Sequence, residues 1–178
     1  MGRVSQAQAE ENRRRVVEAA SRLFKEQGGQ ISVVEVMKKA GLTHGGFYKQ
    51  FASKEALFDE ATTHAFAASG GGTATEAASP EAEIDAYLST KHRDDVAGGC
   101  PVAAFAADIA RGQGGPAAQR QYSEGVSEMA KRLATDQDDG LSRLSTMVGA
   151  LVLARATKGE PVSEEILATA RKALGRGD

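Results

Sequence analysis

Apolar residues recur at helical spacing along most of the chain, and short stretches rich in glycine, proline and polar residues separate them. The first such run covers about residues 12–26, where one helix face carries Val16, Val17, Ala20, Leu23 and Phe24. No segment has the alternation of β-branched and polar residues that is typical of a strand. The pattern therefore predicts an all-α protein.

A capping box begins the second predicted helix. Ser32 and Glu35 have the spacing at which a hydroxyl and a carboxylate satisfy backbone N–H groups at a helix start. The helix then covers residues 33–40, and Gly41 can adopt the left-handed conformation that often ends helices. A short helix capped by Thr43 is expected next. Helix, glycine-containing turn and helix is the spacing of a helix-turn-helix motif.

The short helix, over residues 43–51, has two chemically different faces. Phe47 and Phe51 are four residues apart and predict a side that faces the core. The other side carries hydrogen-bond donors, one positive charge and little bulk: His44, Gly45, Tyr48 and Lys49. Adjacent glycines cost a helix about 1 kcal/mol each, and close approach of the backbone to a ligand is one reason for them. Taken alone, a glycine pair would indicate a loop.

In this order the elements resemble the N-terminal DNA-binding domain of the TetR/AcrR family of transcriptional regulators. The resemblance covers about residues 10–60, including the GLTHGGFYKQF segment and a fourth helix that begins at Ser53-Lys54-Glu55. It implies a three-helix DNA-binding domain with a helix-turn-helix at residues 1–58. A helical ligand-binding and dimerisation domain would then occupy residues 59–178.

The resemblance also implies how the motif contacts DNA. The residues expected at phosphates are Thr43, Tyr48 and Lys54, together with Ser32 through its hydroxyl or through the helix start that it caps. The residues expected in the major groove are His44, Gly45, Gly46 and Lys49. Gly46 stands where the family often has a small polar residue, so we do not expect it to read a base. Gln50 stands where an aromatic residue or histidine is common, and it either reads adenine or supports the helix.

The charge distribution agrees with this placement, although the net charge of −2 does not by itself indicate nucleic-acid binding. Residues 1–58 carry 10 Lys and Arg against 6 Asp and Glu, whereas residues 59–178 carry 12 against 18. The positive excess lies with the motif. The run Arg13-Arg14-Arg15 is either a solvated face or includes a phosphate contact, and Tyr48 either packs or contacts phosphate.

Five further helices are predicted after the fourth helix, which ends near residue 68 and is followed by a loop at residues 69–73. Ser79-Pro80-Glu81 begins one that carries Ile84, Tyr87 and Leu88 and is broken at residues 94–99. The others are expected at residues 101–111, 116–135 and 141–157, and after a capping sequence at Ser163-Glu164-Glu165.

The last two helices carry apolar stripes. The resemblance implies that they pair with those of a second subunit in a four-helix bundle, which makes the chain a homodimer; alternatively, the stripes only complete a monomer core. The predicted interface residues are Leu144, Val148, Leu151, Val152, Ile166, Leu167, Ala170 and Leu174. A two-fold axis would place two recognition segments in successive major grooves about 34 Å apart, which requires a palindromic operator.

These features predict a ligand-responsive transcriptional regulator, in which a small-molecule effector shifts the fourth helix and changes the separation of the two recognition segments. Repression is the commoner behaviour in the resembled family, so a repressor is expected. The candidate effector-pocket residues are the aromatic or soft ones Phe66, Tyr87, Cys100, Phe105 and Tyr122. The effector, the operator and the target genes cannot be read from the sequence.

Other classes are less well supported by the residues. An enzyme with Cys100 as nucleophile would need His64 or His92 as its base, and neither histidine lies in a recognisable motif. A helical adaptor that binds protein is the second alternative. The single cysteine excludes an intramolecular disulfide, and no cluster with zinc spacing or cofactor motif occurs. Without a long apolar run or a secretory signal, a cytoplasmic location without membrane contact is expected.

Overall fold

The computed structural model describes residues 6–69, 79–136 and 139–175, and in these ranges every regular element is helical. The elements are α1 (Gln6–Gln27), α2 (Val33–Lys39), the 3-10 helix η1 (His44–Lys49), α3 (Lys54–Ala68), α4 (Pro80–Tyr87), α5 (Thr90–Asp94), α6 (Pro101–Ala110), α7 (Pro116–Leu133), α8 (Leu141–Ala156) and α9 (Pro161–Leu174). The prediction of an all-α protein is confirmed. Of the predicted loop at residues 69–73, residues 70–73 lie outside the described residues.

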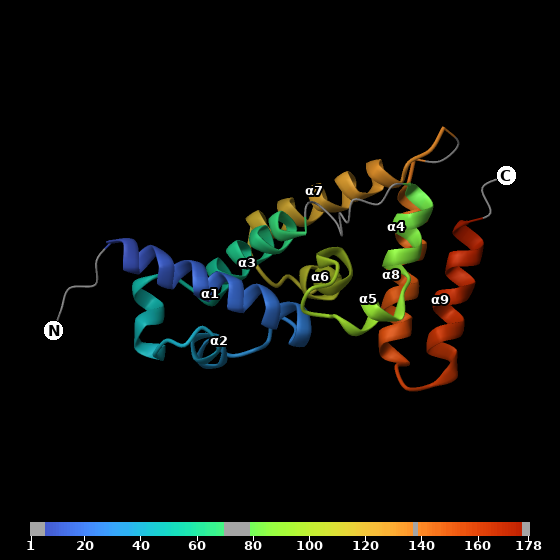
Figure 1. The fold of residues 1–178 in the computed structure, drawn as a ribbon. Coiled ribbons are helices and arrows are strands. Elements are labelled where there is room, and N and C mark those ends of the chain that lie inside the picture. Colours follow the sequence, from blue (N-terminus) through green and yellow to red (C-terminus); the bar gives the residue numbers. More distant parts are fainter. Residues whose placement is uncertain (1–5, 70–78, 137–138, 176–178) are drawn as a thin grey trace.

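The helices form an elongated arrangement with different elements at its two ends (Figure 1). One end consists of α2, η1 and the adjoining parts of α1 and α3, which we call the reading head. At the opposite end, α8 and α9 run antiparallel to each other, with α4 beside them. Between the ends, α6 and α7 pack against α3, so the body of the protein is joined to the reading head mainly through α1 and α3.

Two arginines of the predicted run hold the reading head together. Arg15 donates from Nη2 to the carbonyl oxygen of Ala40 at the end of α2, at 2.6 Å. Arg13 stacks over the ring of Phe51, 4.3 Å from its centroid, and donates to the carbonyl oxygen of Gln50. These contacts fix α2 and the end of η1 against α1. The run is therefore partly structural rather than wholly solvated.

Arg13 also forms an ion pair with Glu60, which connects α1 to α3. The middle residue of the run behaves differently, since Arg14 is exposed and pairs with Glu11 on its own helix at 2.8 Å. The three neighbouring arginines thus divide into two that tie elements together and one that covers the solvated face of α1.

The predicted helix that begins at Pro80 ends earlier than expected. It divides into α4 and α5, because the hydroxyl of Ser89 accepts a hydrogen bond from the backbone N–H of His92 at 3.1 Å and starts a new helix. Ser89 is a favourable N-cap residue, and the prediction overlooked this signal inside an otherwise helical pattern. The resulting bend brings α5 against α8.

The predicted cap of the last helix is also wrong. Glu160 occupies the N-cap position of α9, with Pro161 in its first turn, and Ser163 lies inside the helix. The Ser163 side chain is buried, donates to the carbonyl oxygen of Ala154 at 2.6 Å and accepts from Nη1 of Arg93 at 3.0 Å. A serine that resembled a cap thus joins α5, α8 and α9.

Candidate nucleic-acid interface

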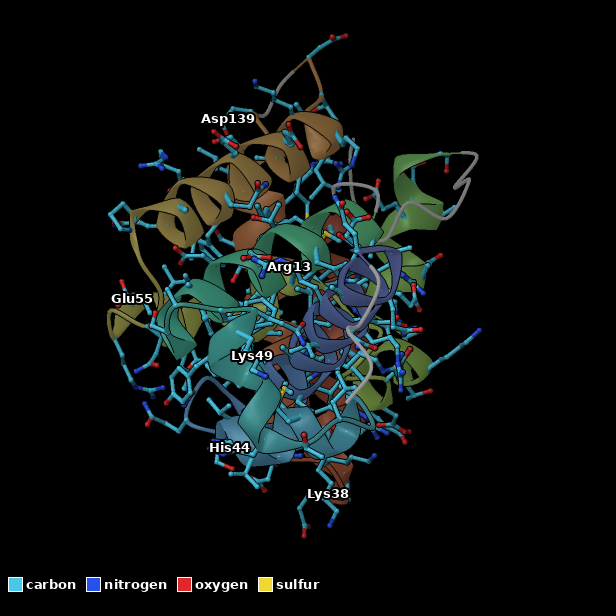
Figure 2. All side chains as sticks on the ribbon, turned by 90° about the vertical axis from the view of Figure 1, so that its left-hand side faces the viewer. Arg13, Lys38, His44, Lys49, Glu55 and Asp139 are labelled. Atoms are coloured by element: carbon cyan, nitrogen blue, oxygen red, sulfur yellow. The ribbon has the colours of Figure 1, made fainter. Side chains whose placement is uncertain are left out.

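The outer face of η1 is exposed at the end of the molecule. His44, Gly45 and Lys49 lie on it, while Phe47 and Phe51 on the inner face are 0% and 2% exposed. Figure 2, which faces this end, shows His44, Lys49 and Lys38 in its lower part, with Arg13 further in between α1 and α3. The prediction of one core face and one polar face is confirmed.

The turn and the short helix are built from local hydrogen bonds. Gly41 has φ +70°, which is the left-handed conformation predicted for the end of α2. Residues 44–49 form a 3-10 helix, as in the bond from the Gly46 N–H to the carbonyl oxygen of Thr43 at 3.1 Å. Thr43 occupies the N-cap position, but its side chain makes no capping hydrogen bond, so this part of the prediction is wrong. Its exposed hydroxyl stays at the surface.

The two adjacent glycines have different surroundings. A Cβ atom added to Gly45 would have no heavy atom within 4 Å, whereas one added to Gly46 would lie 3.8 Å from Cε of Met37. Gly45 is exposed and Gly46 is half-buried. The folded chain itself therefore does not require glycine at residue 45, and the absence of a side chain there leaves the backbone accessible from outside. This contrast agrees with the expectation that Gly46 does not read a base.

Ser32 and Glu35 form the predicted capping box. The Ser32 hydroxyl donates to Oε2 of Glu35 at 2.8 Å and accepts from the Glu35 N–H at 3.2 Å. The same hydroxyl bond lowers the pKa of the Glu35 carboxyl, which keeps it ionised. Because the Ser32 hydroxyl is already engaged, the helix start that it caps is the better candidate for a phosphate contact.

Tyr48 and Lys54 occupy positions from which their polar groups can reach a ligand. Tyr48 is 70% exposed, and its ring makes edge contacts with His44 and Phe47, at centroid distances of 6.3 and 5.0 Å. This exposure favours a surface role over core packing for Tyr48. Lys54 begins α3, where Oγ of Ser53 accepts from the N–H of Ala56 at 3.0 Å. The first turn of α3 therefore offers backbone N–H groups at the helix start where Lys54 lies.

Gln50 supports the motif from its inner side. It is the C-cap residue of η1 and is half-buried, and its carbonyl oxygen accepts the hydrogen bond from Arg13. Its side-chain Oε1 is buried. Of the two roles left open by the sequence, support of the helix fits this position.

Sequence reasoning missed Lys38 and Lys39 as site residues. Both are exposed in the last turn of α2, and Lys38 lies on the same end of the molecule as His44 and Lys49 (Figure 2). Their position off the apolar stripe of α2 was the available signal. Together with Lys49 and Lys54 they give this end a cationic surface.

The five predicted effector-pocket residues are core residues. Phe66, Tyr87, Cys100 and Phe105 are at most 3% exposed, and Tyr122 is half-buried. Phe66 packs against Tyr122 at a centroid distance of 6.1 Å, whereas Phe105 packs against Phe58 at 5.6 Å. Burial raises the pKa of the Tyr122 hydroxyl to about 12. A ligand among these residues would have to displace existing side-chain contacts.

Cys100 and His92 are close in space but are not arranged as a nucleophile and its base. His92 Nε2 accepts from the backbone N–H of Cys100 at 3.0 Å, and Nδ1 lies 2.7 Å from the carbonyl oxygen of Tyr87. The first bond requires an unprotonated Nε2, which leaves the proton on Nδ1. Burial lowers the pKa of His92, which favours the same neutral form. Both ring nitrogens therefore bind backbone groups rather than the thiol.

The predicted dimer residues occupy two environments. Leu144, Leu151, Leu167 and Ala170 are buried within a single chain, where α8 and α9 pack against the rest of the body, so they are core residues rather than a free surface. Val148, Ile166 and Leu174 are partly buried against this core. Val152 is 43% exposed, beside Leu153 at 57%, which the prediction did not include in the interface. The exposed large apolar residues of these two helices are Leu141, Val152 and Leu153 on α8 and Val162 on α9.

Two further features are absent from the described ranges. No group of three or more His, Cys, Asp or Glu residues within them could hold a metal ion. Among the helices in those ranges, none combines the length and the apolar character needed to cross a membrane.

Comparison with known proteins gives a consistent result. The family model described as "Bacterial regulatory proteins, tetR family" matches residues 16–61, which include α2 and η1. Over 61 residues, or 34% of this chain, the sequence is 39% identical to the HTH-type transcriptional regulator AcrR of Shigella flexneri. The chain covers only 28% of that relative's length. The sequence similarity is thus concentrated in the reading head.

Solved structures extend the similarity of fold to nearly the whole chain. A TetR transcriptional regulator from Chloroflexus aurantiacus has a TM-score of 0.70 and 22% identity, over 95% of this chain and 94% of that one. A TetR-family regulator from Cytophaga hutchinsonii has a TM-score of 0.68 and 18% identity, over 98% and 97%. The reduced form of E. coli NemR gives 0.70 and 16%, over 92% and 95%. At these identities the similarity establishes the fold.

Proposed function

We propose that this chain, which is similar in sequence to TetR-family regulators around its reading head and in fold over nearly its whole length, is a DNA-binding repressor that binds a palindromic operator as a homodimer. A small-molecule effector releases it from the operator. The observation that carries the DNA-binding part is the outer face of η1, where exposed His44, Gly45 and Lys49 lie opposite two fully buried phenylalanines. This face is exposed in the single chain, so a ligand can contact it.

Phosphate contacts and base contacts are assigned to different residues of the reading head. The DNA phosphates are assigned to Tyr48, Lys54 and the capped start of α2. These offer a hydroxyl, an ammonium and helix-terminal N–H groups. His44 and Lys49 are assigned to base edges, since they lie on the outer face of η1, where Gly45 has no side chain. Lys38 and Lys39 add electrostatic attraction.

Substitutions in these two groups should affect binding differently. We expect Lys54→Ala and Tyr48→Phe to weaken binding by a similar factor for all DNA sequences, because phosphates carry no sequence information. Lys49→Ala and His44→Ala should change the preferred bases, at a cost of about 1–3 kcal/mol at the positions they contact. Binding of each variant to a library of single-base operator variants measures both effects. Identical preference profiles for all four variants would refute the assignment.

The dimer is proposed to form through the outer face of α8. Val152 and Leu153 are exposed there, and Gly149 on the same helix has no heavy atom within 4 Å of a Cβ position, so a second helix can approach closely. This end of the molecule is opposite the reading head (Figure 1). Pairing through it leaves both reading heads free to reach successive major grooves.

A charge placed on this face should dissociate the dimer. Leu153→Asp would leave a carboxylate in an apolar interface, so we expect a monomer at concentrations where the wild type is dimeric and a loss of operator affinity of about tenfold or more. Analytical ultracentrifugation and operator binding measure the two effects. Ser127→Asp, on the exposed side of α7, is the matched control and should stay dimeric. Dimeric Leu153→Asp protein would contradict this interface.

The proposed repressor binds its operator in the cytoplasm, and this binding involves no catalytic step. The effector acts through the helices that connect the reading head to the body, α1 and α3, since a ligand changes operator affinity only if it binds the two arrangements with different affinities. Binding of duplex DNA should weaken steeply with added salt because phosphate contacts release counterions. A protein-binding adaptor would not show this dependence on any duplex.

A further inference from the structure

A pocket lies between the reading head and the body, away from the predicted effector residues. Its volume is about 240 Å³, and it is lined by α1, by the last turn of α3 and by the loop that leads to α6. Its polar lining residues are Glu18, Ser21 and Ser69 and three nitrogen-bearing side chains, Arg22, Lys25 and His64, and small side chains such as Ala65 and Ala97 form the rest. These three nitrogen-bearing side chains have no role in the proposed DNA interface.

The cationic groups in this pocket lack carboxylate partners. Lys25 is half-buried, and its ammonium donates to the carbonyl oxygen of Gly99 at 3.3 Å. No ion pair to Arg22 or Lys25 occurs within the described ranges of the chain. Nδ1 of His64 is buried without a hydrogen-bond partner in the same ranges. Arg22 and Lys25 therefore have hydrogen-bonding capacity left at the pocket, and the buried Nδ1 of His64 is an unsatisfied group in its wall.

The nearby carboxylates do not neutralise these groups. Glu18 lines the pocket, but its Oε2 lies 3.9 Å from Nη1 of Arg14 on the outside of α1. Asp95 is turned to its own loop, where Oδ1 accepts the N–H of Gly98 at 2.8 Å. Burial, and then the repulsion from Arg22, lower the pKa of Lys25, and the attraction of Asp95 opposes them only in part. A bound anion would counter this lowering of the pKa, because a nearby negative charge favours the charged ammonium.

We propose that this pocket binds a small organic carboxylate, held by Lys25, Arg22 and His64. Its volume is below the range of about 300–1,000 Å³ typical of pockets for drug-sized ligands, so the ligand has few carbon atoms beside its acid group. The alanine side chains of α3 and of the loop offer an apolar wall for that part. The carboxylate accepts charge-assisted hydrogen bonds from side chains of two helices.

The position of the pocket suggests how an occupant would act. Lys25 belongs to α1 and bonds the loop before α6, while His64 belongs to α3. A carboxylate that recruits both side chains would change the contact between α1 and the body. This consequence rests on the proposed function, whereas the binding site itself does not.

The test uses the full chain without DNA, with benzoate as the probe and benzamide as its uncharged counterpart. By NMR titration or calorimetry we expect benzoate to bind at least about tenfold more tightly than benzamide, because bonds to charged groups exceed neutral ones in strength. Lys25→Met should remove this preference, and Arg22→Gln, which changes an exposed residue, should reduce it. Lys131→Met, which removes an exposed lysine from α7, should leave benzoate binding unchanged.

Equal binding of benzoate and benzamide, or benzoate binding that is the same in Lys25→Met and wild type, would overturn the proposal. Circular dichroism shows whether each variant is folded, and Arg22→Gln provides the answer should Lys25→Met fail to fold. Because no DNA is present, a negative result does not bear on DNA binding. Conversely, a protein that binds no duplex can still prefer benzoate, so the two proposals fail separately.

Discussion

Gly45→Ala should lose at least about tenfold in operator affinity while remaining as stable as the wild type. In the folded chain, a Cβ atom at this position has no heavy atom within 4 Å, and Gly45 does not have a positive φ. Replacing a helical glycine by alanine stabilises by up to about 1 kcal/mol. On DNA, the added methyl group would lie between the backbone of η1 and the groove, where close approach needs glycine.

The adjacent glycine is the matched control for this experiment. Gly46→Ala makes the same chemical change one residue away, but its Cβ would lie 3.8 Å from Cε of Met37, on the inner side of the motif. We expect Gly46→Ala to retain operator affinity within about threefold, which corresponds to less than 1 kcal/mol. Fluorescence anisotropy with one labelled operator and thermal unfolding measure both quantities. Unchanged affinity in Gly45→Ala would show that the backbone there does not approach DNA.

Phe47→Ala should lower the free energy of unfolding of the reading head by about 3–5 kcal/mol. The ring is 0% exposed, stacks on Phe51 at a centroid distance of 5.5 Å and contacts Tyr48 at 5.0 Å. Alanine would leave a cavity beneath η1, and a six-residue 3-10 helix has little stability apart from such packing. Operator binding should be lost together with the local fold.

Tyr48→Ala separates this effect from a loss of contact with DNA. Tyr48 adjoins Phe47 but is 70% exposed, so its removal should change the unfolding free energy by less than about 1 kcal/mol. It should nevertheless weaken DNA binding. Urea denaturation and amide hydrogen exchange in α2 and η1 report on the stability of the head. If Phe47→Ala unfolded at the wild-type denaturant concentration, the packing described for the reading head would be contradicted.

The sequence predicted the helical elements well where hydrophobic period and caps agreed. As expected, α2 begins at the capping box of Ser32 and ends just before the left-handed Gly41. Phe47 and Phe51 lie in the core, also as expected. Caps inside longer helical patterns were harder to interpret. Ser89 begins a new helix, whereas Ser163, which has the same chemistry, lies within one and bonds to Arg93. A hydroxyl can satisfy either kind of partner, and only the tertiary structure decides between them.

The candidate site was predictable in its exposed residues but not in its long-range contacts. The opposite faces of residues 44–51 follow from spacing alone. That Arg13 reaches Gln50 and Glu60, 37 and 47 residues away in the sequence, depends on how α1 crosses the motif. Likewise, an amphipathic stripe does not state which partner it faces. Leu144 and Leu151, which were predicted at the interface, are core residues, whereas the exposed Leu153 was not among the predicted interface residues.

The pocket between the reading head and the body could not be predicted from the sequence, because its lining residues come from segments far apart in the chain. Lys25 and His64 belong to helices that are separated by the whole motif, and neither residue lies in a recognisable pattern. Their common surroundings become apparent only when α1 and α3 are packed together. The aromatic residues that were predicted to form the effector pocket lie in the core of the body instead.

Selection from a random library of duplex DNA with the 178-residue chain tests the central claim most directly, namely that the outer face of η1 reads duplex DNA. We predict enrichment of an inverted repeat whose half-sites are one helical turn apart, about 10 base pairs, or a multiple of it. The same selection with Gly45→Ala should give little enrichment. A wild-type protein that enriches no duplex, or that enriches the same sequences as strongly when Gly45 is replaced, would contradict this account.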